Sequence, residues 1–419
     1  MSNQTAVTIL TATGGVTNNG VSVVNTPSIT YGLDFTNPNA LVLTVNGVHF
    51  GGGAPDLSGN QRSLAGYFQN IYNSGGAPAL ADAMGYLANL NAGDLASALD
   101  HLNPTSYLVQ ANTAATTGQN FANALLSCYG FDGTYAAIRE HECAWAKVSG
   151  GSTTQTASST NPGYYEQGVR IQAGAQFAIK PDWFLGFGMG YERANGNVGV
   201  AATYNASRYD IGAILKYVNG PWLLAGALDA GYAGADTTRS IGFPAPATTA
   251  YSASSTWHLD GKLRAAYLLE AGNFYAKPMI DGDVTYLYMP GFSEYGAGAL
   301  NLNVNGMSDV VLSATPAVEL GVTAIDGGDH VLRPRVSVGA TFFSKNSLSA
   351  DATFAGAPAG SVPFTTTTSF PQVVAKVSGG IDLFSKRQTG GLDIRLQYDG
   401  QFADGFQSHT GGIKASMRF

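Results

Sequence analysis

The chain ends with Gly411-Gly412-Ile413-Lys414-Ala415-Ser416-Met417-Arg418-Phe419, and this stretch decides the fold. Read with a period of two, one face is apolar and ends on an aromatic residue, while the other face carries a lysine and an arginine. A strand of a membrane barrel needs one side for lipid and one polar side for the lumen. The stretch therefore predicts the last strand of a transmembrane β-barrel.

The composition also fits such a barrel. Only 12% of the 419 residues are charged, which is about half of the roughly 25% found in soluble domains. The sequence contains no apolar run of about 18 residues, so it predicts no helical membrane span. The 54 glycines suit crowded strand positions and the 21 tyrosines suit a membrane interface. A soluble β-sandwich or β-helix is also rich in these residues, so composition alone leaves that alternative open.

About twelve segments are predicted to be strands, and several of them alternate cleanly between apolar and polar residues. Leu392–Tyr398, for example, reads Leu-Asp-Ile-Arg-Leu-Gln-Tyr, so its apolar residues share one face. Alternation over about ten residues spans a bilayer when the strand is tilted. The candidate strands lie near 143–150, 169–179, 183–193, 206–217, 222–235, 257–269, 273–288, 308–323, 331–343, 371–384, 392–398 and 407–419.

The connections between these strands differ in length. In a membrane barrel, periplasmic turns are short and external loops are long. The alternation therefore predicts an even strand count, with both ends of the barrel domain in the periplasm, and it is hard to obtain from a soluble sandwich. Short connections lie near 180–183, 218–221, 270–273 and 385–390, and long ones near 194–206, 236–255, 289–307 and 344–370.

Two further zones precede the strands. Residues 1–54 contain short β-like runs between Asn and Gly turns, which predicts a segment like the last rungs of a parallel β-helix. Residues 55–140 have helical spacing of their apolar residues. Within them, 105–127 is mostly small or polar, which suits a thin helix inside a narrow, water-lined barrel. An Ala-rich surface helix is the alternative. The predicted domains are thus 1–54, 55–140 and 141–419.

Many charged residues fall on the inward face of the predicted strands. Mixed charges in a wall of low dielectric are expected to pair across strands and stiffen the barrel. They are also expected to contact polar side chains of the threaded helix. The cations are Lys147, Arg170, Lys216, Lys262, Arg264, Lys277, Arg333, Arg335, Lys376, Arg395 and Lys414. The anions are Asp210, Asp229, Asp260, Asp281, Asp283, Glu319, Asp382, Asp393 and Asp399.

Net charge, cysteines and the N-terminus add three expectations. The net charge of −7 and the scattered cations argue against a nucleic-acid partner. Cys128 and Cys143 are close enough in sequence for one local disulfide in an oxidising compartment, with two buried thiols as the alternative. The first residues carry neither a basic nor an apolar signal region, so we expect the chain to lack its true N-terminus.

Motifs for catalysis are missing. The sequence has no Gly-x-Ser-x-Gly, His-Glu-x-x-His or Cys-x-x-Cys. His141-Glu142-Cys143 lies where helix gives way to strand and is interpreted as a connector rather than a metal site. Gly51-Gly52-Gly53 is interpreted as a flexible joint. The sequence therefore predicts no enzyme, no cofactor and no metal site.

The chain resembles the translocator end of the monomeric autotransporters, the type V secretion family. The resemblance covers residues 57–419 and rests on the order of four weak motifs. They are Leu57-Ser58-Gly59-Asn60-Gln61-Arg62-Ser63-Leu64, Asp94-Leu95-Ala96-Ser97-Ala98-Leu99-Asp100-His101-Leu102-Asn103-Pro104, Cys143-Ala144-Trp145-Ala146-Lys147-Val148-Ser149-Gly150-Gly151 and Met417-Arg418-Phe419.

The resemblance implies a twelve-stranded outer-membrane barrel with a helix through its pore and a β-helical passenger upstream. It also implies partners: membrane lipid and lipopolysaccharide, periplasmic chaperones, the barrel assembly machinery and the protein's own passenger. A C-terminal assembly signal would comprise Ile413, Ala415, Met417 and Phe419. The sequence departs from the family in lacking a signal peptide and in having only a stub of passenger. No motif selects a cleavage site among Asn103, Asn112, Asn120 and Asn123.

Three functions compete at this stage. The first is an outer-membrane translocator that supports export and surface display of an N-terminal passenger. The second is a small-solute porin, which would not need the helical segment before the barrel. The third is a secreted adhesin or structural protein built from soluble sandwiches, which would not shift on boiling in detergent gels.

Overall fold

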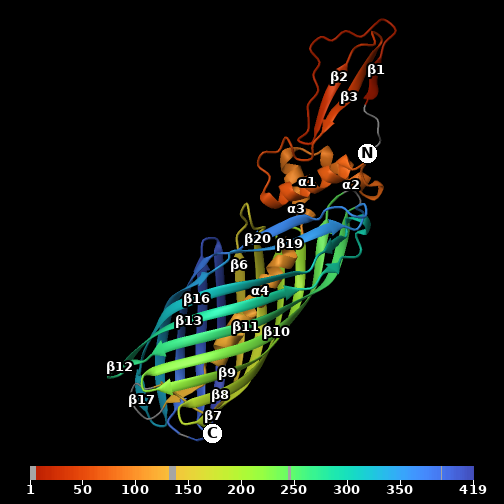
Figure 1. Cartoon of the computed structure of the whole chain (residues 1–419). Coiled ribbons are helices and arrows are strands. Elements are labelled where there is room, and N and C mark those ends of the chain that lie inside the picture. Colours follow the sequence, from red (N-terminus) through yellow and green to blue (C-terminus); the bar gives the residue numbers. More distant parts are fainter. Residues whose placement is uncertain (1–5, 132–137, 244–246, 388) are drawn as a thin grey trace.

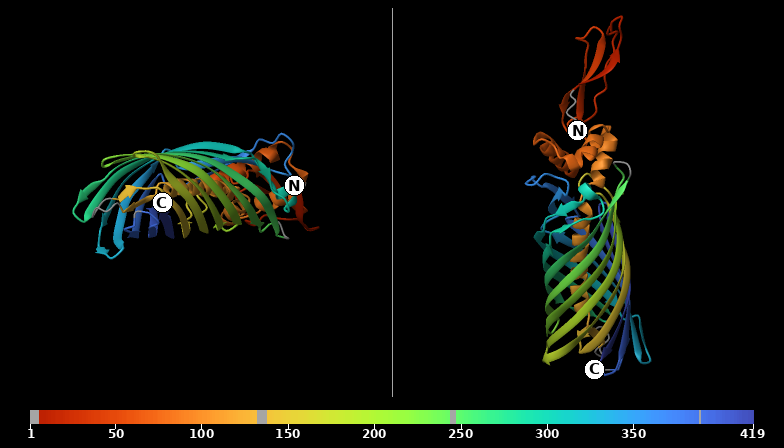
Figure 2. Two further views of the ribbon diagram at one scale, coloured as in Figure 1. Left: turned by 90° about the horizontal axis from the view of Figure 1, so that it is seen from below. Right: turned by 90° about the vertical axis from the view of Figure 1, so that its right-hand side faces the viewer.

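The computed structural model describes residues 6–131, 138–243, 247–387 and 389–419. Three parts follow one another along a single long axis, as Figure 1 shows: a small sheet near the N-terminus, a layer of helices, and a barrel. The C-terminus lies at the end of the barrel farthest from the helices (Figures 1 and 2). This arrangement puts the helical layer over one mouth of the barrel.

Within the described residues, twelve antiparallel strands close into a barrel, as the alternation predicts. The barrel closes because the last strand, β23 (Phe406–Arg418), pairs with the first, β6 (Cys143–Gln155). The other ten barrel strands are β7 (Tyr164–Lys180), β8 (Trp183–Val198), β9 (Ala202–Asn219), β10 (Trp222–Ile241), β11 (Thr248–Tyr267), β13 (Phe274–Met289), β16 (Met307–Val322), β18 (His330–Phe343), β21 (Val373–Ser385) and β22 (Leu392–Ala403). Two short strands, β12 (Leu269–Ala271) and β17 (Ile325–Gly327), pair with β13 and β18 in turns at the end of the barrel where the C-terminus lies.

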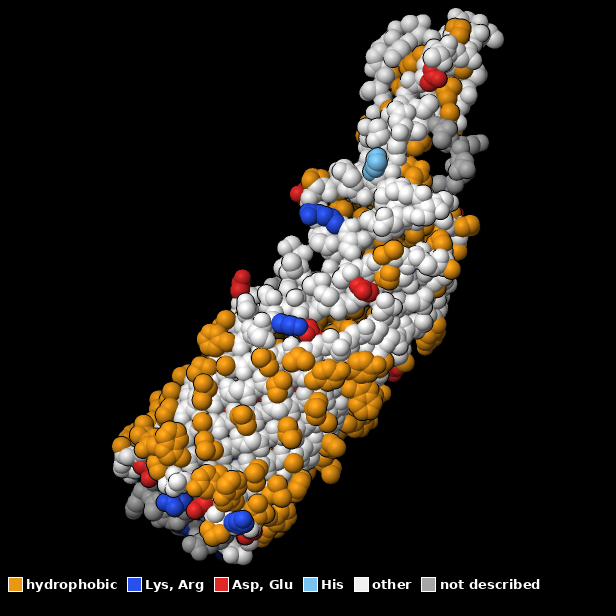
Figure 3. Space-filling view, in the orientation of Figure 1, with side chains coloured by type: hydrophobic (Ala, Val, Ile, Leu, Met, Phe, Trp, Pro, Cys, Tyr) orange, Lys and Arg blue, Asp and Glu red, His pale blue; other side chains and the backbone are white. Residues whose placement is uncertain are grey.

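The barrel exterior carries an apolar band between two rows of aromatic residues. Figure 3 shows hydrophobic side chains gathered over the part of the barrel nearest the C-terminus. On β10, Trp222 and Tyr232 mark the two edges of the band, ten positions apart (222 and 232), which is the length of a membrane-crossing strand. Ring pairs on the turn side are Trp183–Tyr217 and Trp222–Tyr267, and pairs on the opposite side are Tyr191–Tyr209 and Tyr232–Trp257.

Two of the predicted long loops are mostly strand, so those predictions were wrong. β8 and β9 are separated only by residues 199–201, and β10 and β11 only by residues 242–247. Beyond the aromatic rows the outward residues become polar, as at Arg193 and Asn195, so the apolar alternation stops. Backbone pairing nevertheless continues, for example between Asn195 and Asn205. These strands therefore extend past the membrane band.

The other two predicted loops, 289–307 and 344–370, contain a second small sheet. It runs in the order β14 (Phe292–Ser293), β15 (Leu302–Val304), β19 (Ser347–Phe354) and β20 (Phe364–Ser369), with a short 3-10 turn at Gly298–Leu300. This sheet lies at the barrel mouth beneath the helices (Figure 1). The tyrosine ring of Tyr67 packs 5.1 Å from Phe364 and 5.9 Å from Phe354, between ring centroids.

The helices begin and end at clear signals. In α1 (Gly59–Asn73), the Ser58 side chain accepts a hydrogen bond from the Gln61 backbone N–H. The Gln61 side chain accepts one from the Ser58 backbone N–H, so the two residues form a capping box. A 3-10 turn (Pro78–Leu80), α2 (Ala81–Ala88) and α3 (Ala92–His101) follow, and α4 (Thr105–Leu125) enters the barrel. No helix in the described ranges is both long and apolar enough to cross a membrane.

The N-terminal sheet differs from the parallel β-helix rungs expected for residues 1–54. Its three strands, β1 (Ala6–Thr11), β2 (Ile29–Asp34) and β3 (Ala40–Val48), are antiparallel, with β3 in the centre. The connection between β2 and β3, residues 35–39, is short. A short connection allows a hairpin, whereas parallel strands need a long crossover.

The predicted helical segment 55–140 also ends differently. After α4, β4 (Tyr129–Phe131) and β5 (Ile138–Glu140) form an antiparallel pair at the C-terminal mouth of the barrel. Residues 132–137 between these two strands lie outside the described part of the chain.

Candidate functional site

The site is the barrel lumen with α4 inside it. In the barrel, α4 packs mainly against β7, β8, β9, β10, β11 and β13 (Figures 1 and 2). Three successive inward positions of β8 are glycines, Gly186, Gly188 and Gly190. A Cβ at Gly188 would lie 2.6 Å from Leu125 Cδ2, and one at Gly190 would lie 3.3 Å from Phe121. The missing side chains therefore make the groove in which this helix lies.

The outer end of α4 is tied to the barrel through one buried carboxylate, Glu294. Glu294 pairs with Arg239, and the hydroxyl of Tyr107 on α4 donates to its Oε1 at 2.7 Å. Arg239 also donates to the last carbonyl of α3, His101 O, at 2.8 Å. Burial and the adjacent Glu294 raise the pKa of Tyr107 well above its usual value, so the phenol stays a neutral donor.

The middle of α4 is held by two ion pairs in the wall. Arg208, which is 2% exposed, donates to Thr113 Oγ1 at 2.8 Å and pairs with Glu166 at 2.5 Å. Thr117 donates to Glu192 Oε2 at 2.9 Å, and Glu192 pairs with Arg170 at 2.9 Å. The hydroxyls of α4 thus complete the bonding of the paired charges, which lowers the cost of burying them.

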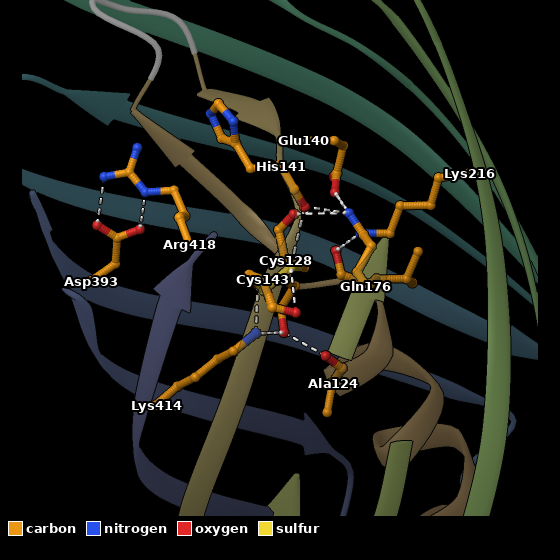
Figure 4. Close-up of a disulfide and its surroundings, with 12 residues drawn as sticks. Ala124, Cys128, Glu140, His141, Cys143, Gln176, Lys216, Asp393, Lys414 and Arg418 are labelled. Atoms are coloured by element: carbon orange, nitrogen blue, oxygen red, sulfur yellow. Dashed lines mark hydrogen bonds and ion pairs between the residues drawn. A yellow bond between two sulfur atoms is a disulfide. The ribbon is translucent and has the colours of Figure 1, made fainter. Parts of the chain in front are cut away.

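The inner end of α4 is capped by two lysines (Figure 4). Lys216 Nζ donates to Leu126 O at 3.0 Å and pairs with Glu140 at 2.6 Å. Lys414 Nζ donates to Ser127 O at 2.5 Å and lies 4.6 Å from the Trp145 ring centroid. Cations are favourable at a helix C-terminus, where the last carbonyls have no partner within the helix.

A disulfide continues this inner attachment. Cys128, three residues beyond α4, is bonded to Cys143 at the start of β6 (Figure 4). Gln176 donates to Cys128 O at 3.3 Å and to His141 O at 3.0 Å. His141 and Glu142 therefore belong to the connector between helix and barrel, and Cys143 is the first residue of β6.

The wall opposite α4 encloses open space. A cavity of about 480 Å³ lies between the inner half of the helix, at Asn120 and Asn123, and the far wall. Lys147 and Lys376 line it, and in the described parts of the chain neither has a carboxylate within salt-bridge distance. A second cavity of about 130 Å³ lies beside the outer half, at Asn112 and Thr116. Charged and polar linings of this size hold water.

Eight of the twenty inward charges expected from the sequence lie in the barrel interior with the contacts given below. They are Arg170, Lys262, Arg264, Arg333, Arg335, Asp393, Arg395 and Lys414. Lys414 contacts Ser127, as described above, and Arg333, which is 0% exposed, lies over the rings of Tyr275 and Phe384. The pairs of the other six are Arg170–Glu192, Lys262–Asp283, Arg264–Asp281, Arg335–Asp382, Arg395–Asp382 and Asp393–Arg418. Arg264 Nη2 also reaches Asn123 Oδ1 of α4, at 3.5 Å.

The four residues of the suggested assembly signal lie on the barrel exterior. Ile413, Ala415 and Met417 project outward from β23, and Phe419 follows the strand. The Phe419 ring lies 5.6 Å from that of Phe177 on β7, between centroids. The terminal aromatic residue is thus accessible in the lipid-facing row near the C-terminal mouth.

The structure brings together one group that the sequence did not suggest. Asp210, Asp229, His258 and Asp260 converge in the wall beneath Gly118 of α4, and we refer to these four residues as the Asp–His cluster. Each residue falls on an inward position of its strand, so the sequence indicates their direction. Their convergence depends on strand register, which no sequence motif marks.

Comparison with known proteins identifies the fold and family. Residues 144–413 match the sequence profile of the family described as Autotransporter beta-domain, which is more than half of the chain. The chain belongs to the autotransporter β-domain family. No curated protein matches it significantly.

Solved autotransporter structures are similar to this chain. The translocator domain of NalP from Neisseria meningitidis is 14% identical, with a TM-score of 0.58 over 75% of this chain and 99% of that domain. The transport unit of AIDA-I from Escherichia coli is 12% identical, with a TM-score of 0.46 over 74% and 99% of the two chains. The β domain of Bordetella BrkA is 13% identical, with a TM-score of 0.46 over 67% and 100%.

These findings confirm the resemblance stated from the sequence. The chain contains an outer-membrane autotransporter barrel, and that barrel is a translocator with an associated passenger segment. The barrel itself is a transport structure. The contacts of α4 with the wall are therefore the contacts by which an autotransporter barrel holds its pore helix.

Proposed function

We propose that the autotransporter barrel, after supporting export, retains α4 in its pore and displays the preceding residues at the cell surface. In this proposal residues 1–54 are a passenger remnant, 55–140 the linker with 105–127 as its pore-threading part, and 141–419 the translocator. One observation carries the proposal: wall residues bond α4 at its outer end, its middle and its inner end. A helix held along its length suits a permanent anchor better than a transient plug.

Surface display is tested by an epitope inserted in the turn at 14–15 of the N-terminal sheet. Antibody binding to intact cells, and loss of the epitope on adding external protease, are the expected results. An epitope placed in the opposite turn at 220–221, between β9 and β10, is the matched control and should be reached only after the outer membrane is opened. Equal labelling of both sites in intact cells would contradict the proposed orientation.

Assembly forms a second part of the proposal. We propose that periplasmic chaperones and the barrel assembly machinery act on this chain, and that Ile413, Ala415, Met417 and Phe419 form the signal for insertion among lipid and lipopolysaccharide. Phe419→Ala is expected to lower the amount of folded barrel in the membrane severalfold, with little effect on a barrel already folded. Phe177→Ala is the control, because it removes the same ring contact and keeps the terminal aromatic. Equal assembly of the two variants would refute the signal.

A small-solute channel is the competing function. It is tested by deleting residues 105–127 and comparing single-channel conductance with that of the intact chain. The anchor proposal expects a large increase in conductance, because the deletion empties the lumen. An unchanged conductance would favour a channel whose path does not involve α4.

A further inference from the structure

The Asp–His cluster holds a compact set of potential metal ligands. One ligand atom each of Asp210, Asp229 and His258 lies within 4.8 Å of the others, and Asp260 borders this set. His258 Nε2 lies 3.1 Å from Asp210 Oδ1, 3.5 Å from Asp260 Oδ2 and 3.8 Å from Asp229 Oδ2. Three neighbouring strands supply the residues: β9, β10 and β11. The four side chains are between 1% and 4% exposed. The cluster is therefore closed off from bulk solvent.

The polar atoms of the cluster lack ordinary partners. Among the residues that the structure describes, neither ring nitrogen of His258 makes a hydrogen bond, and neither do the carboxylate oxygens of Asp210 and Asp229. Only Asp260 has a neutral donor, because the Thr285 hydroxyl donates to its Oδ1. The imidazole is instead directed at the three carboxylates. One imidazole cannot balance three buried carboxylates, and uncompensated buried charge is strongly unfavourable, so a bound cation would stabilise this group.

Neighbouring cations do not neutralise the cluster, because each is engaged by another carboxylate. Arg208 pairs with Glu166, Lys216 with Glu140 and Lys262 with Asp283. The strand register also sets Asp229 directly opposite Asp260. Like charges in directly opposed positions repel each other. The four residues thus hold three carboxylates against one imidazole.

We propose that the Asp–His cluster binds one divalent metal ion of the Zn²⁺ class. Zn²⁺ takes imidazole nitrogen and carboxylate oxygen at about 2.0–2.2 Å in tetrahedral sites. Tetrahedral ligands at that radius lie roughly 3.4 Å from one another. The distances from His258 Nε2 to the three carboxylates, 3.1–3.8 Å, bracket this value, and the ligand atoms of Asp210, Asp229 and His258 all lie within 4.8 Å of one another. Calcium and magnesium prefer all-oxygen sites, so the imidazole disfavours them.

The metal would lie at the contact between α4 and the barrel. A Cβ on Gly118 would be 2.3 Å from Asp260 Oδ2 and 2.4 Å from His258 Nε2. On the barrel side, a Cβ on Gly231 would be 2.1 Å from His258 Cε1. The absence of side chains at Gly118 and Gly231 therefore lets the backbone of α4 and of β10 approach the cluster closely. The smaller cavity reaches Thr285, the partner of Asp260, and gives an ion a route from the lumen.

The test measures metal binding by the full-length folded protein. The protein is stripped with a chelator and refolded in detergent with or without Zn²⁺, so that slow access does not hide the site. Metal content after desalting and titration calorimetry are then compared for the wild type and for Asp229→Asn combined with His258→Gln. We expect about one Zn²⁺ per wild-type chain. Loss of two ligands is expected to weaken binding by at least the roughly 100-fold that outer-sphere changes reach.

The control variant combines Asp236→Asn with His409→Gln. Asp236 is an exposed residue of the same strand as Asp229, and His409 lies beside Tyr398 at the outer aromatic row. Equal Zn²⁺ affinity of the wild type and the cluster variant would overturn the proposal. If the cluster variant does not fold, measurements on the wild-type protein alone test the proposal. Co²⁺ should then give a visible spectrum with imidazole coordination and a chelator-reversible rise in melting temperature, and the absence of both would overturn the proposal.

Discussion

The two walls of the lumen treat the pore helix differently. The wall from β7 to β13 presents glycines such as Gly188 and Gly190 and paired charges such as Arg208 with Glu166, and α4 packs directly on it. The wall from β16 through β23 to β6 presents long cationic side chains, and the larger cavity separates most of it from the helix. Side-chain size therefore divides one barrel into two halves: the wall from β7 to β13, which we call the seat because α4 packs on it, and a half that faces the larger cavity.

This difference shows how a barrel can retain a helix without being filled by it. On the seat, Thr113 accepts a hydrogen bond from Arg208 and Thr117 donates one to Glu192, so these α4 hydroxyls complete the bonding of the buried ion pairs. On the far wall, Lys147 and Lys414 lie directly opposite each other on paired strands. Of these two lysines, only Lys414 contacts the segment that follows α4, where it donates to Ser127 O. Hydration by the cavity offsets the repulsion between them. The seat therefore determines where the helix lies, and the far wall determines what else the lumen admits.

Disrupting the close packing of α4 against the seat should lower barrel stability more than any other change considered below. Gly118→Leu places a side chain where Asp260 and His258 already lie, at 2.3 Å and 2.4 Å from the new Cβ. Overpacking of this kind costs about 3 kcal/mol or more when the neighbours are rigid. We expect a lower temperature for the heat-induced gel shift and more frequent open-channel events in planar bilayers.

Gly66→Leu is the control for this change. Gly66 is also a helical glycine, but it is exposed and a Cβ there meets nothing within 4 Å. The control should behave as the wild type and gain slightly from better helix propensity. Equal behaviour of Gly118→Leu and Gly66→Leu would mean that α4 does not need the seat.

The disulfide links the helix segment to the far wall, since Cys143 begins β6. Replacing Cys128 and Cys143 with serine should lower the free energy of unfolding by about 2–3 kcal/mol, because the bond closes a loop of about 15 residues in the unfolded chain. Thermal unfolding in detergent checks the size of the effect. Titration of the wild type under denaturing, non-reducing conditions should find no free thiol, and two free thiols would refute the bond.

The sequence predicts the barrel well because lipid imposes a simple rule. Every second residue across the apolar band must be apolar, so a strand such as Leu392–Tyr398 can be predicted from its own sequence, without knowledge of the neighbouring strands. Beyond the band that rule no longer applies. The outer halves of β8 and β9 therefore read as loops, although their backbones stay paired. The antiparallel N-terminal sheet escaped prediction for a similar reason, since Asn and Gly turns do not reveal strand direction.

The sequence predicts which charged residues face the lumen, but it does not predict which of them contact one another. Inward-facing charges follow from alternation, and so does the direction of Asp229 and Asp260. Their contact with Asp210 and His258 depends on the register of three strands, which the sequence does not encode as a motif. The glycine triplet Gly186, Gly188 and Gly190 is the clearest overlooked signal, because its period of two places all three on the lumen face. It indicates which wall a helix could approach.

Changing the far wall should alter ion preference more than stability. Lys147→Gln combined with Lys376→Gln removes two cations of the larger cavity that have no carboxylate partner among the described residues. We expect anion-over-cation permeability to fall by about tenfold, equivalent to about 1.4 kcal/mol. Reversal potentials in a salt gradient measure it. Lys180→Gln combined with Lys345→Gln, two exposed lysines, is the control, and an equal change in both proteins would remove any special role of the cavity.

The two faces of α4 itself give the finest comparison of the walls. Gln110 is buried on the seat, where its amide donates to Thr237 Oγ1 at 2.9 Å, whereas Asn112 lines the smaller cavity. Gln110→Ala should cost about 1 kcal/mol, because it leaves the Thr237 hydroxyl without this partner. Asn112→Ala should cost nothing and could only gain from helix propensity. Unfolding midpoints in denaturant give both values, and a larger loss for Asn112→Ala would show that the helix is held from the cavity side.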